Sequence, residues 1–208
     1  MTKVKICGIT NLEDARLSVE FGADMIGFNF FAGSKRFVDA EYAESIAERL
    51  VTPVTKVGVF VNQSIEDILD AEGIVELDVI QLHGNESSDF VSELRTKSFA
   101  KIIKVFRVGP NFRTVEIDDY AVDAIMLDSC SNTEFGGTGE TFDWRLAAEV
   151  ATVAKDFYLA GGLNSANVAE AIRLVKPYAV DVASGVESSP GKKDPKKVEA
   201  FIKNVKSA

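Results

Sequence analysis

The chain has 208 residues, 46% of them hydrophobic, and a formal net charge of −9 at pH 7. This length predicts one domain over residues 1–208 with a sizeable core, in preference to two small ones. The acidic balance argues against nucleic-acid and anionic-membrane partners, because both need a basic face. Cys7 and Cys130 lack metal-ligand spacing, so we expect no metal site. Without a leader or a membrane-length apolar run, we expect a cytoplasmic protein.

Short β-branched runs alternate eight times with longer segments of helical apolar spacing. The predicted strands cover residues 4–7, 25–30, 55–61, 79–83, 102–108, 124–128, 157–160 and 180–184. The predicted helices cover residues 11–21, 40–50, 64–72, 86–97, 111–120, 144–155, 165–175 and 195–206. Thr10 and Glu13 have the spacing of a capping box for the first helix, and Asp194 with Pro195 opens the last.

Eight such units in one domain predict an α/β fold, a single (β/α)8 TIM barrel of near-minimal length. An open flavodoxin-like sheet would need fewer strands. A Rossmann fold would need a Gly-x-Gly-x-x-Gly segment after the first strand, where only Gly8 is present.

In such a barrel the carboxyl ends of the strands meet at one face, and polar residues gather at those ends. The residues there are Cys7, Asn29, Asn62, His83, Arg107, Asp128, Gly161, Gly162, Ser184 and Gly185. Cys7 is either a reactive thiol or a buried, chemically silent cysteine. Asp128 ends an apolar strand, which favours a neutral carboxyl suited to general-acid work, although a loop carboxylate is the plainer interpretation.

The loops after the seventh and eighth predicted strands have small residues where a backbone must approach a ligand closely. Gly161 and Gly162 follow the seventh strand, and Ser184 and Gly185 end the eighth. Either pair alone could simply make a turn. Both together, at adjacent strand ends, predict a phosphate site built from backbone amides.

Seven segments in order resemble the phosphoribosylanthranilate isomerase family of tryptophan biosynthesis, and the resemblance spans nearly the whole chain. They read KICGIT (5–10), SKR (34–36), VGVF (57–60), QLHG (81–84), GGTG with TFDW (136–139 and 141–144), LAGGL (159–163) and DVASGVE (181–187).

The resemblance implies an isomerase of aromatic amino acid biosynthesis that carries out an Amadori rearrangement of a phosphosugar-anthranilate substrate without a cofactor. Asp128 then corresponds to the general acid that opens the sugar ring, and Cys7 to the base that removes the C2′ proton. Arg36 corresponds to the residue that meets the anthranilate carboxylate, and Asp181 to one that orients the substrate. His83, the only histidine, is expected at the substrate, although a structural role fits it equally well.

Within the family pattern, the glycine-rich residues 136–140 after the sixth predicted strand predict a mobile lid, because glycine permits a closure that excludes water. This chain departs from the pattern at Ala183, where a serine is common, at Asn85, where an aspartate is usual, and before Arg36, where two prolines are missing. Family members occur as monomers and dimers, and we favour a monomer.

Three other functions fit parts of the pattern. A histidine-pathway aminoaldose isomerase would be expected to have an aspartate in place of Cys7. Indole-glycerol-phosphate synthase would need an early catalytic lysine and an N-terminal extension. A non-catalytic phosphosugar-binding barrel would have no need of both Cys7 and Asp128.

Strand parity places Lys5 on the same side of the first strand as Cys7, with Asp181 on the neighbouring eighth strand. Because an unpaired charge inside a barrel is costly, we predict an ion pair between Lys5 and Asp181.

Overall fold

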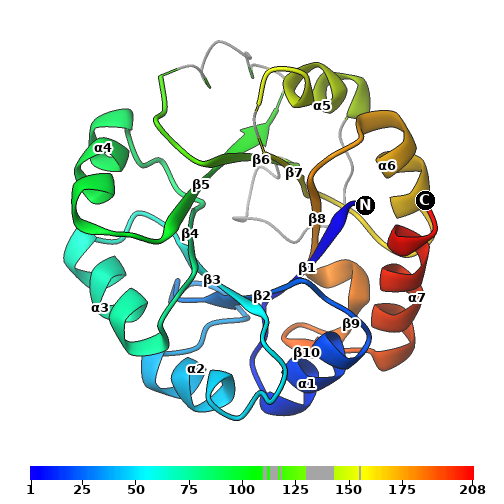
Figure 1. Cartoon of the computed structure of the whole chain (residues 1–208), viewed down its shortest axis with the longest axis horizontal. Coiled ribbons are helices and arrows are strands. Elements are labelled where there is room, and N and C mark those ends of the chain that lie inside the picture. Colours follow the sequence, from blue (N-terminus) through cyan, green and yellow to red (C-terminus); the bar gives the residue numbers. More distant parts are fainter. Residues whose placement is uncertain (110–111, 113–116, 118, 130–142, 155) are drawn as a thin grey trace.

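Eight parallel strands form a closed barrel in the computed structural model, which describes residues 1–109, 112, 117, 119–129, 143–154 and 156–208. The strands follow one another around the barrel in chain order, and β8 pairs with β1 to close it (Figure 1). This confirms the predicted TIM barrel. The strands are β1 (Lys3–Cys7), β2 (Met25–Asn29), β3 (Thr55–Phe60), β4 (Val79–Leu82), β5 (Lys101–Val108), β6 (Ala124–Ser129), β7 (Phe157–Leu159) and β8 (Ala179–Val182).

Helices surround the barrel on its outside (Figure 1). They are α1 (Leu12–Glu20), α2 (Ala40–Ala47), α3 (Ile65–Val75), α4 (Ser88–Lys97), α5 (Trp144–Ala151), α6 (Val168–Val175) and α7 (Pro195–Lys206). Most begin at a short polar residue whose side chain accepts a hydrogen bond from an amide of the first turn, as Ser64 and Asp194 do. Among the described residues, no helix combines the length and the apolar character needed to cross a bilayer.

The start of α1 differs from the prediction. Asn11 is the N-cap residue, and its side-chain oxygen accepts a hydrogen bond from the amide of Asp14 at 2.8 Å. The Thr10 hydroxyl instead donates to the carbonyl of Gly191, in the loop after β8. The predicted capping box is therefore wrong, because a tertiary contact occupies the side chain that would have capped the helix.

Other boundaries differ too. The helix predicted over 165–175 begins at Val168, because residues 164–167 form a turn in which Asn167 accepts a hydrogen bond from the Asn164 amide at 2.8 Å. The helix predicted over 111–120 falls mainly outside the described residues, and the predicted lid at 136–140 lies wholly outside them. The sequence also did not reveal a short antiparallel hairpin after β8, formed by β9 (Glu187–Ser189) and β10 (Lys192–Lys193).

The core has two parts, because side chains of a barrel strand point alternately outward and inward. The larger cluster lies between the strands and the helices and includes Val4, Ile6, Ile80 and Phe201. The smaller cluster consists of inward-facing residues: Met25, Val57, Val79, Ile103, Val105, Ala124, Met126, Tyr158, Ala160 and Ala179. Most of these sit in the first half of their strands, so the interior is apolar toward the amino-terminal end.

Candidate active site

Cys7 is the last residue of β1, at the carboxyl-terminal end of the barrel, and only 8% of it is exposed. It pairs in register with Gly27 of β2. A Cβ atom at position 27 would lie 3.0 Å from the Cys7 sulfur and 3.0 Å from the Lys5 nitrogen. The glycine therefore leaves the space into which both side chains reach.

The predicted ion pair between Lys5 and Asp181 is present. The two residues are direct register partners across the closure of β1 on β8, and Nζ of Lys5 lies 2.9 Å from Oδ1 of Asp181. The Lys5 side chain is completely buried and that of Asp181 is 10% exposed. Inside the barrel, the ammonium group is stabilised by a carboxylate that closure brings to it.

The surroundings of Cys7 act on its pKa in opposite directions. Burial raises the pKa of the Cys7 thiol, and the charge of Asp181 acts the same way, while Lys5 and Lys193 oppose this rise. For Lys5, burial disfavours the charged form, but attraction to Asp181 and Cys7 outweighs it and raises the pKa of Lys5. Lys5 therefore stays an ammonium group beside the sulfur.

Asp128 lies near the end of β6 and is 5% exposed. Its Oδ1 atom accepts a hydrogen bond from the Ser129 amide at 2.8 Å. Its Oδ2 atom lies 3.2 Å from Nε2 of His83, directly after β4. The two groups are in contact, but their alignment is too poor for a hydrogen bond, and Nε2 has no other partner among the described residues. The structure thus places His83 against the predicted acid.

A small cavity brings together the predicted acid, one predicted substrate residue and the predicted phosphate site. It is lined by Asp128, Ala160, Gly161, Gly162, Leu163, Asp181, Val182, Ala183, Ser184 and Gly185. Gly161 and Gly162 both have positive φ angles, 86° and 64°. Residues with a Cβ atom rarely adopt this backbone conformation, so glycine is favoured at both positions. Cys7 and Arg36 do not line this cavity; Cys7 is connected to it through Lys5 and Asp181.

Arg36 lies over the end of β1, beside Gly8, where a Cβ atom would come within 2.4 Å of the arginine side chain. Its guanidinium group forms a bidentate pair with Glu187 of β9, with hydrogen bonds of 2.8 and 2.7 Å. The contact of Arg36 with a substrate carboxylate remains a prediction. In the structure, the buried Glu187 carboxylate accounts for the orientation of the planar guanidinium donors.

Lys193 of β10 is a buried cation that the sequence did not single out. Its Nζ atom lies 2.9 Å from Oε1 of Glu187 and also donates to the carbonyl of Cys7. Burial lowers the pKa of Lys193, against the attraction of Glu187. For Glu187, burial acts to raise the pKa, but Arg36 and Lys193 together hold it below its ordinary value. The hairpin thereby connects Arg36 to the end of β1.

Sequence reasoning also missed Gln81, which is 1% exposed on the inward-facing side of β4, with no hydrogen-bond partner for its side-chain oxygen among the described residues. A signal was available for Gln81 and Glu187, because both belong to segments that carried the family resemblance. For Lys193 the sequence offered no signal, because only the folded hairpin buries this residue.

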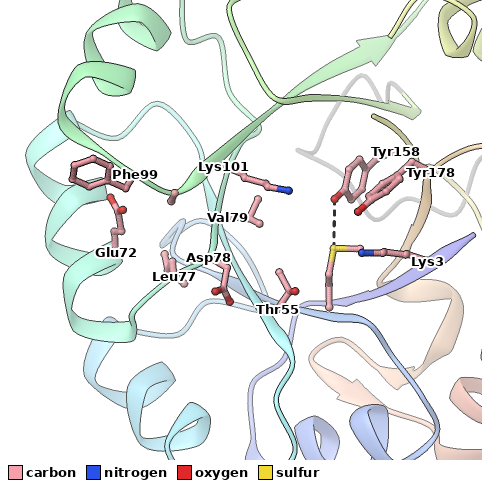
Figure 2. A pocket seen from close by; sticks show the side chains of 12 residues that line it. Lys3, Thr55, Glu72, Leu77, Asp78, Val79, Phe99, Lys101, Tyr158 and Tyr178 are labelled. Carbon is pink, nitrogen blue, oxygen red and sulfur yellow. Dashed lines mark hydrogen bonds between the residues drawn. The ribbon is translucent and has the colours of Figure 1, made fainter. Parts of the chain in front are cut away.

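A wider pocket lies at the opposite, amino-terminal end of the barrel. Figure 2 shows Lys3, Tyr158 and Tyr178 on one side of this pocket, with Phe99 and Glu72 on the other. The Tyr158 hydroxyl donates to the Met25 sulfur at 3.5 Å, and Lys3 lies 5.1 Å from the centre of the Tyr178 ring. None of the predicted site residues lines it. Barrel enzymes carry their chemistry at the carboxyl ends of the strands, so this pocket lies at the end away from the predicted site.

The closed (β/α)8 barrel has a thiol, a carboxyl group and glycine-lined loops at the carboxyl-terminal ends of its strands. This is the architecture of a barrel enzyme. The family of N-(5′-phosphoribosyl)anthranilate (PRA) isomerase matches residues 4–204. The chain belongs to this family, as its sequence segments indicated.

Individual relatives agree in length and fold. The N-(5′-phosphoribosyl)anthranilate isomerase of Trichlorobacter lovleyi is 45% identical over 208 residues and covers 100% of both chains. A crystal structure of a phosphoribosyl anthranilate isomerase in complex with reduced 1-(o-carboxyphenylamino)-1-deoxyribulose 5-phosphate is 40% identical, with a TM-score of 0.85 over 100% of both chains. A structure of monomers generated from the dimeric Thermotoga maritima enzyme is 41% identical, with the same TM-score and coverage.

The buried cation of the hairpin gives a stability prediction. Replacing Lys193 by Met removes one of the two cations that hold the buried Glu187 carboxylate, so we expect a loss of roughly 3 kcal/mol in the free energy of unfolding. Replacing the adjacent, exposed Lys192 by Met should change it by less than about 0.5 kcal/mol. Urea denaturation followed by circular dichroism measures both, and equal midpoints for the two variants would contradict the role given to Lys193.

Proposed function

We propose that this chain converts N-(5′-phosphoribosyl)anthranilate to 1-(2-carboxyphenylamino)-1-deoxyribulose 5-phosphate, an Amadori rearrangement in tryptophan biosynthesis. The observation that carries the proposal is the presence of Cys7 and Asp128 at the ends of β1 and β6, in a member of the isomerase family. Of the alternatives, the histidine-pathway isomerase would be expected to have an aspartate at position 7.

The reaction needs a proton to be donated to oxygen and another to be removed from carbon. Asp128, in its neutral form, donates a proton to the furanose ring oxygen, and the C1′–O bond breaks to leave an iminium ion. The Cys7 thiolate then removes the C2′ proton, and the electron pair of that bond neutralises the iminium to give an enolamine. Tautomerisation of the enolamine yields the ketone.

Neighbouring residues act on both of these groups. Asp128 is 5% exposed, its Oδ1 atom accepts a hydrogen bond from the Ser129 amide, and its Oδ2 atom lies against Nε2 of His83. Cys7 keeps a cation beside it, which a thiolate needs in a buried position. Around Cys7, Lys5 and Lys193 thus oppose the burial and the Asp181 charge that raise its pKa.

The remaining predicted residues are assigned to substrate binding. Arg36 would meet the anthranilate carboxylate with its planar donors, and its pairing with Glu187 would fix the plane of those donors in advance. Asp181 would orient the sugar from the wall of the cavity. The amides around Gly161, Gly162, Ser184 and Gly185 would hold the 5′-phosphate, because small residues let the backbone approach it.

The first test is turnover of freshly prepared N-(5′-phosphoribosyl)anthranilate, followed by the loss of anthranilate-type fluorescence. We expect rapid decay with the parent protein, and a fall in kcat of about 10²–10⁴-fold for Cys7→Ser and for Asp128→Asn. Asp70→Asn, on the exposed side of α3, is the matched control and should retain full activity. A folded parent protein without activity would disprove the assignment, and the histidine-pathway substrate would be tested next.

The phosphate site gives a second test. A Cβ atom at Gly185 would lie 1.9 Å from the carbonyl oxygen of Leu163, so Gly185→Ala must displace one of the two loops that line the cavity. We expect weaker competitive inhibition by inorganic phosphate and a KM raised by about tenfold or more. Gly73→Ala is the control, since its Cβ would meet nothing within 4 Å and a helix prefers alanine by about 1 kcal/mol. Equal inhibition in both variants would place the phosphate elsewhere.

We keep the monomer as the proposed state of this chain. Its relative from Thermotoga maritima is described as dimeric. Sedimentation velocity at micromolar concentration distinguishes the two states, and a species of twice the chain mass would reject the monomer.

A further inference from the structure

Lys5 is a fully buried cation that no step of the proposed reaction uses. Its side chain is 0% exposed and points into the barrel, where a lone ammonium group would be strongly unfavourable. The ion pair with Asp181 occupies one of its three N–H donors, through the 2.9 Å contact with Oδ1. Among the described residues, this is the only hydrogen bond of the ammonium group, so two of its donors remain.

The Cys7 sulfur is a candidate acceptor for them. Lys5 and Cys7 are two residues apart on β1, so their side chains share the inward face. Both end beside Gly27 of β2, where one added carbon would lie 3.0 Å from each of the two atoms. The sulfur and the nitrogen thus approach the same point, and only the absence of a side chain at position 27 allows it.

Within the part of the chain that the structure describes, three charged groups act on Cys7 from the elements packed around it. Lys5 is on its own strand, Asp181 is on β8, and Lys193 of β10 donates to the Cys7 carbonyl. Gly27, the register partner of Cys7 on β2, carries no charge. Burial and Asp181 raise the pKa of Cys7, whereas Lys5 and Lys193 act to lower it. Lys5 is the larger of the two opposing influences, so it is the group whose removal should matter most.

We propose that Lys5 is a positioning residue for Cys7: its ammonium group, anchored on Asp181, stabilises the thiolate and fixes the sulfur at the end of β1. The proposal rests on the proposed function only for the role of Cys7 as the base. When the thiolate accepts the C2′ proton it becomes a neutral thiol, and Lys5 remains protonated and paired with Asp181. Lys5 itself therefore transfers no proton.

The geometry makes Asp181 a competitor of the thiolate, because both anions draw on one ammonium group. Removing the cation and removing the competing anion should then have opposite effects on Cys7. Lys5→Met should make the thiolate harder to form, and Asp181→Asn should make it easier. A purely structural role for Lys5 would not produce this pair of opposite effects.

The test measures the alkylation rate of Cys7 by iodoacetamide as a function of pH, in the full chain without substrate. Peptide mass spectrometry follows Cys7 separately from Cys130. For Lys5→Met we expect the rate at pH 8 to fall about tenfold and the titration to move to higher pH. For Asp181→Asn we expect a several-fold higher rate at that pH. Lys3→Met, on the same strand and face but exposed at the far end of the barrel, should leave the curve unchanged.

Lys5→Arg keeps the proposal testable if Lys5→Met does not fold. It retains the cation, so its titration should remain close to that of the parent protein, while kcat falls because the sulfur is displaced. Folding of each variant is checked by circular dichroism. A folded Lys5→Met whose Cys7 titration matches that of Lys3→Met would overturn the proposal, as would an Asp181→Asn variant that shifts the titration to higher pH.

The alkylation assay and the turnover assay test the role of Lys5 and the proposed function separately. If the Cys7 titration responds to both substitutions but the substrate is not turned over, the coupling of Lys5 to Cys7 stands and the proposed function falls. If turnover is normal but the titration does not respond, the function stands and the role of Lys5 falls.

Discussion

Closure of the barrel between β1 and β8 is the constraint on which the site depends. These strands lie at opposite ends of the chain, yet their register places Lys5 directly beside Asp181. The pair occupies the barrel interior above the apolar layer that fills its amino-terminal half. Two charges there are stable only together, so the site exists only once the last strand has closed on the first.

The same principle recurs at two other buried lysines. Lys193 is held by Glu187, and Lys104 of β5 by Glu86, with N–O distances of 2.9 and 2.7 Å. In each case a loop or hairpin that follows a barrel strand supplies the carboxylate. Such pairs contribute little net stability relative to an apolar core. These pairs instead fix the positions of neighbouring groups. Glu187 also accepts a hydrogen bond from Arg36, and Glu86 accepts one from the amide of Gly84.

Sequence periodicity predicted the eight strands well because it reports which side chains must leave water, and the barrel buries both faces of each strand. It failed where a residue had two competing partners. Thr10 has the chemistry of an N-cap, but its hydroxyl bonds to the Gly191 carbonyl, and Asn11 caps the helix instead. The hairpin that contains Lys193 was missed because its strands are only two and three residues long, too short for a repeating pattern.

The sequence by itself determined the barrel, the family and the residue types at the strand ends, since these follow from hydrophobic periodicity and from segments that local chain order preserves. Strand parity even predicted the pairing of Lys5 with Asp181. Only the tertiary structure decided which groups touch: His83 with Asp128, Arg36 with Glu187, and Lys193 with the end of β1. These contacts join residues tens to more than a hundred positions apart, and their geometry depends on side-chain packing, which no local pattern records.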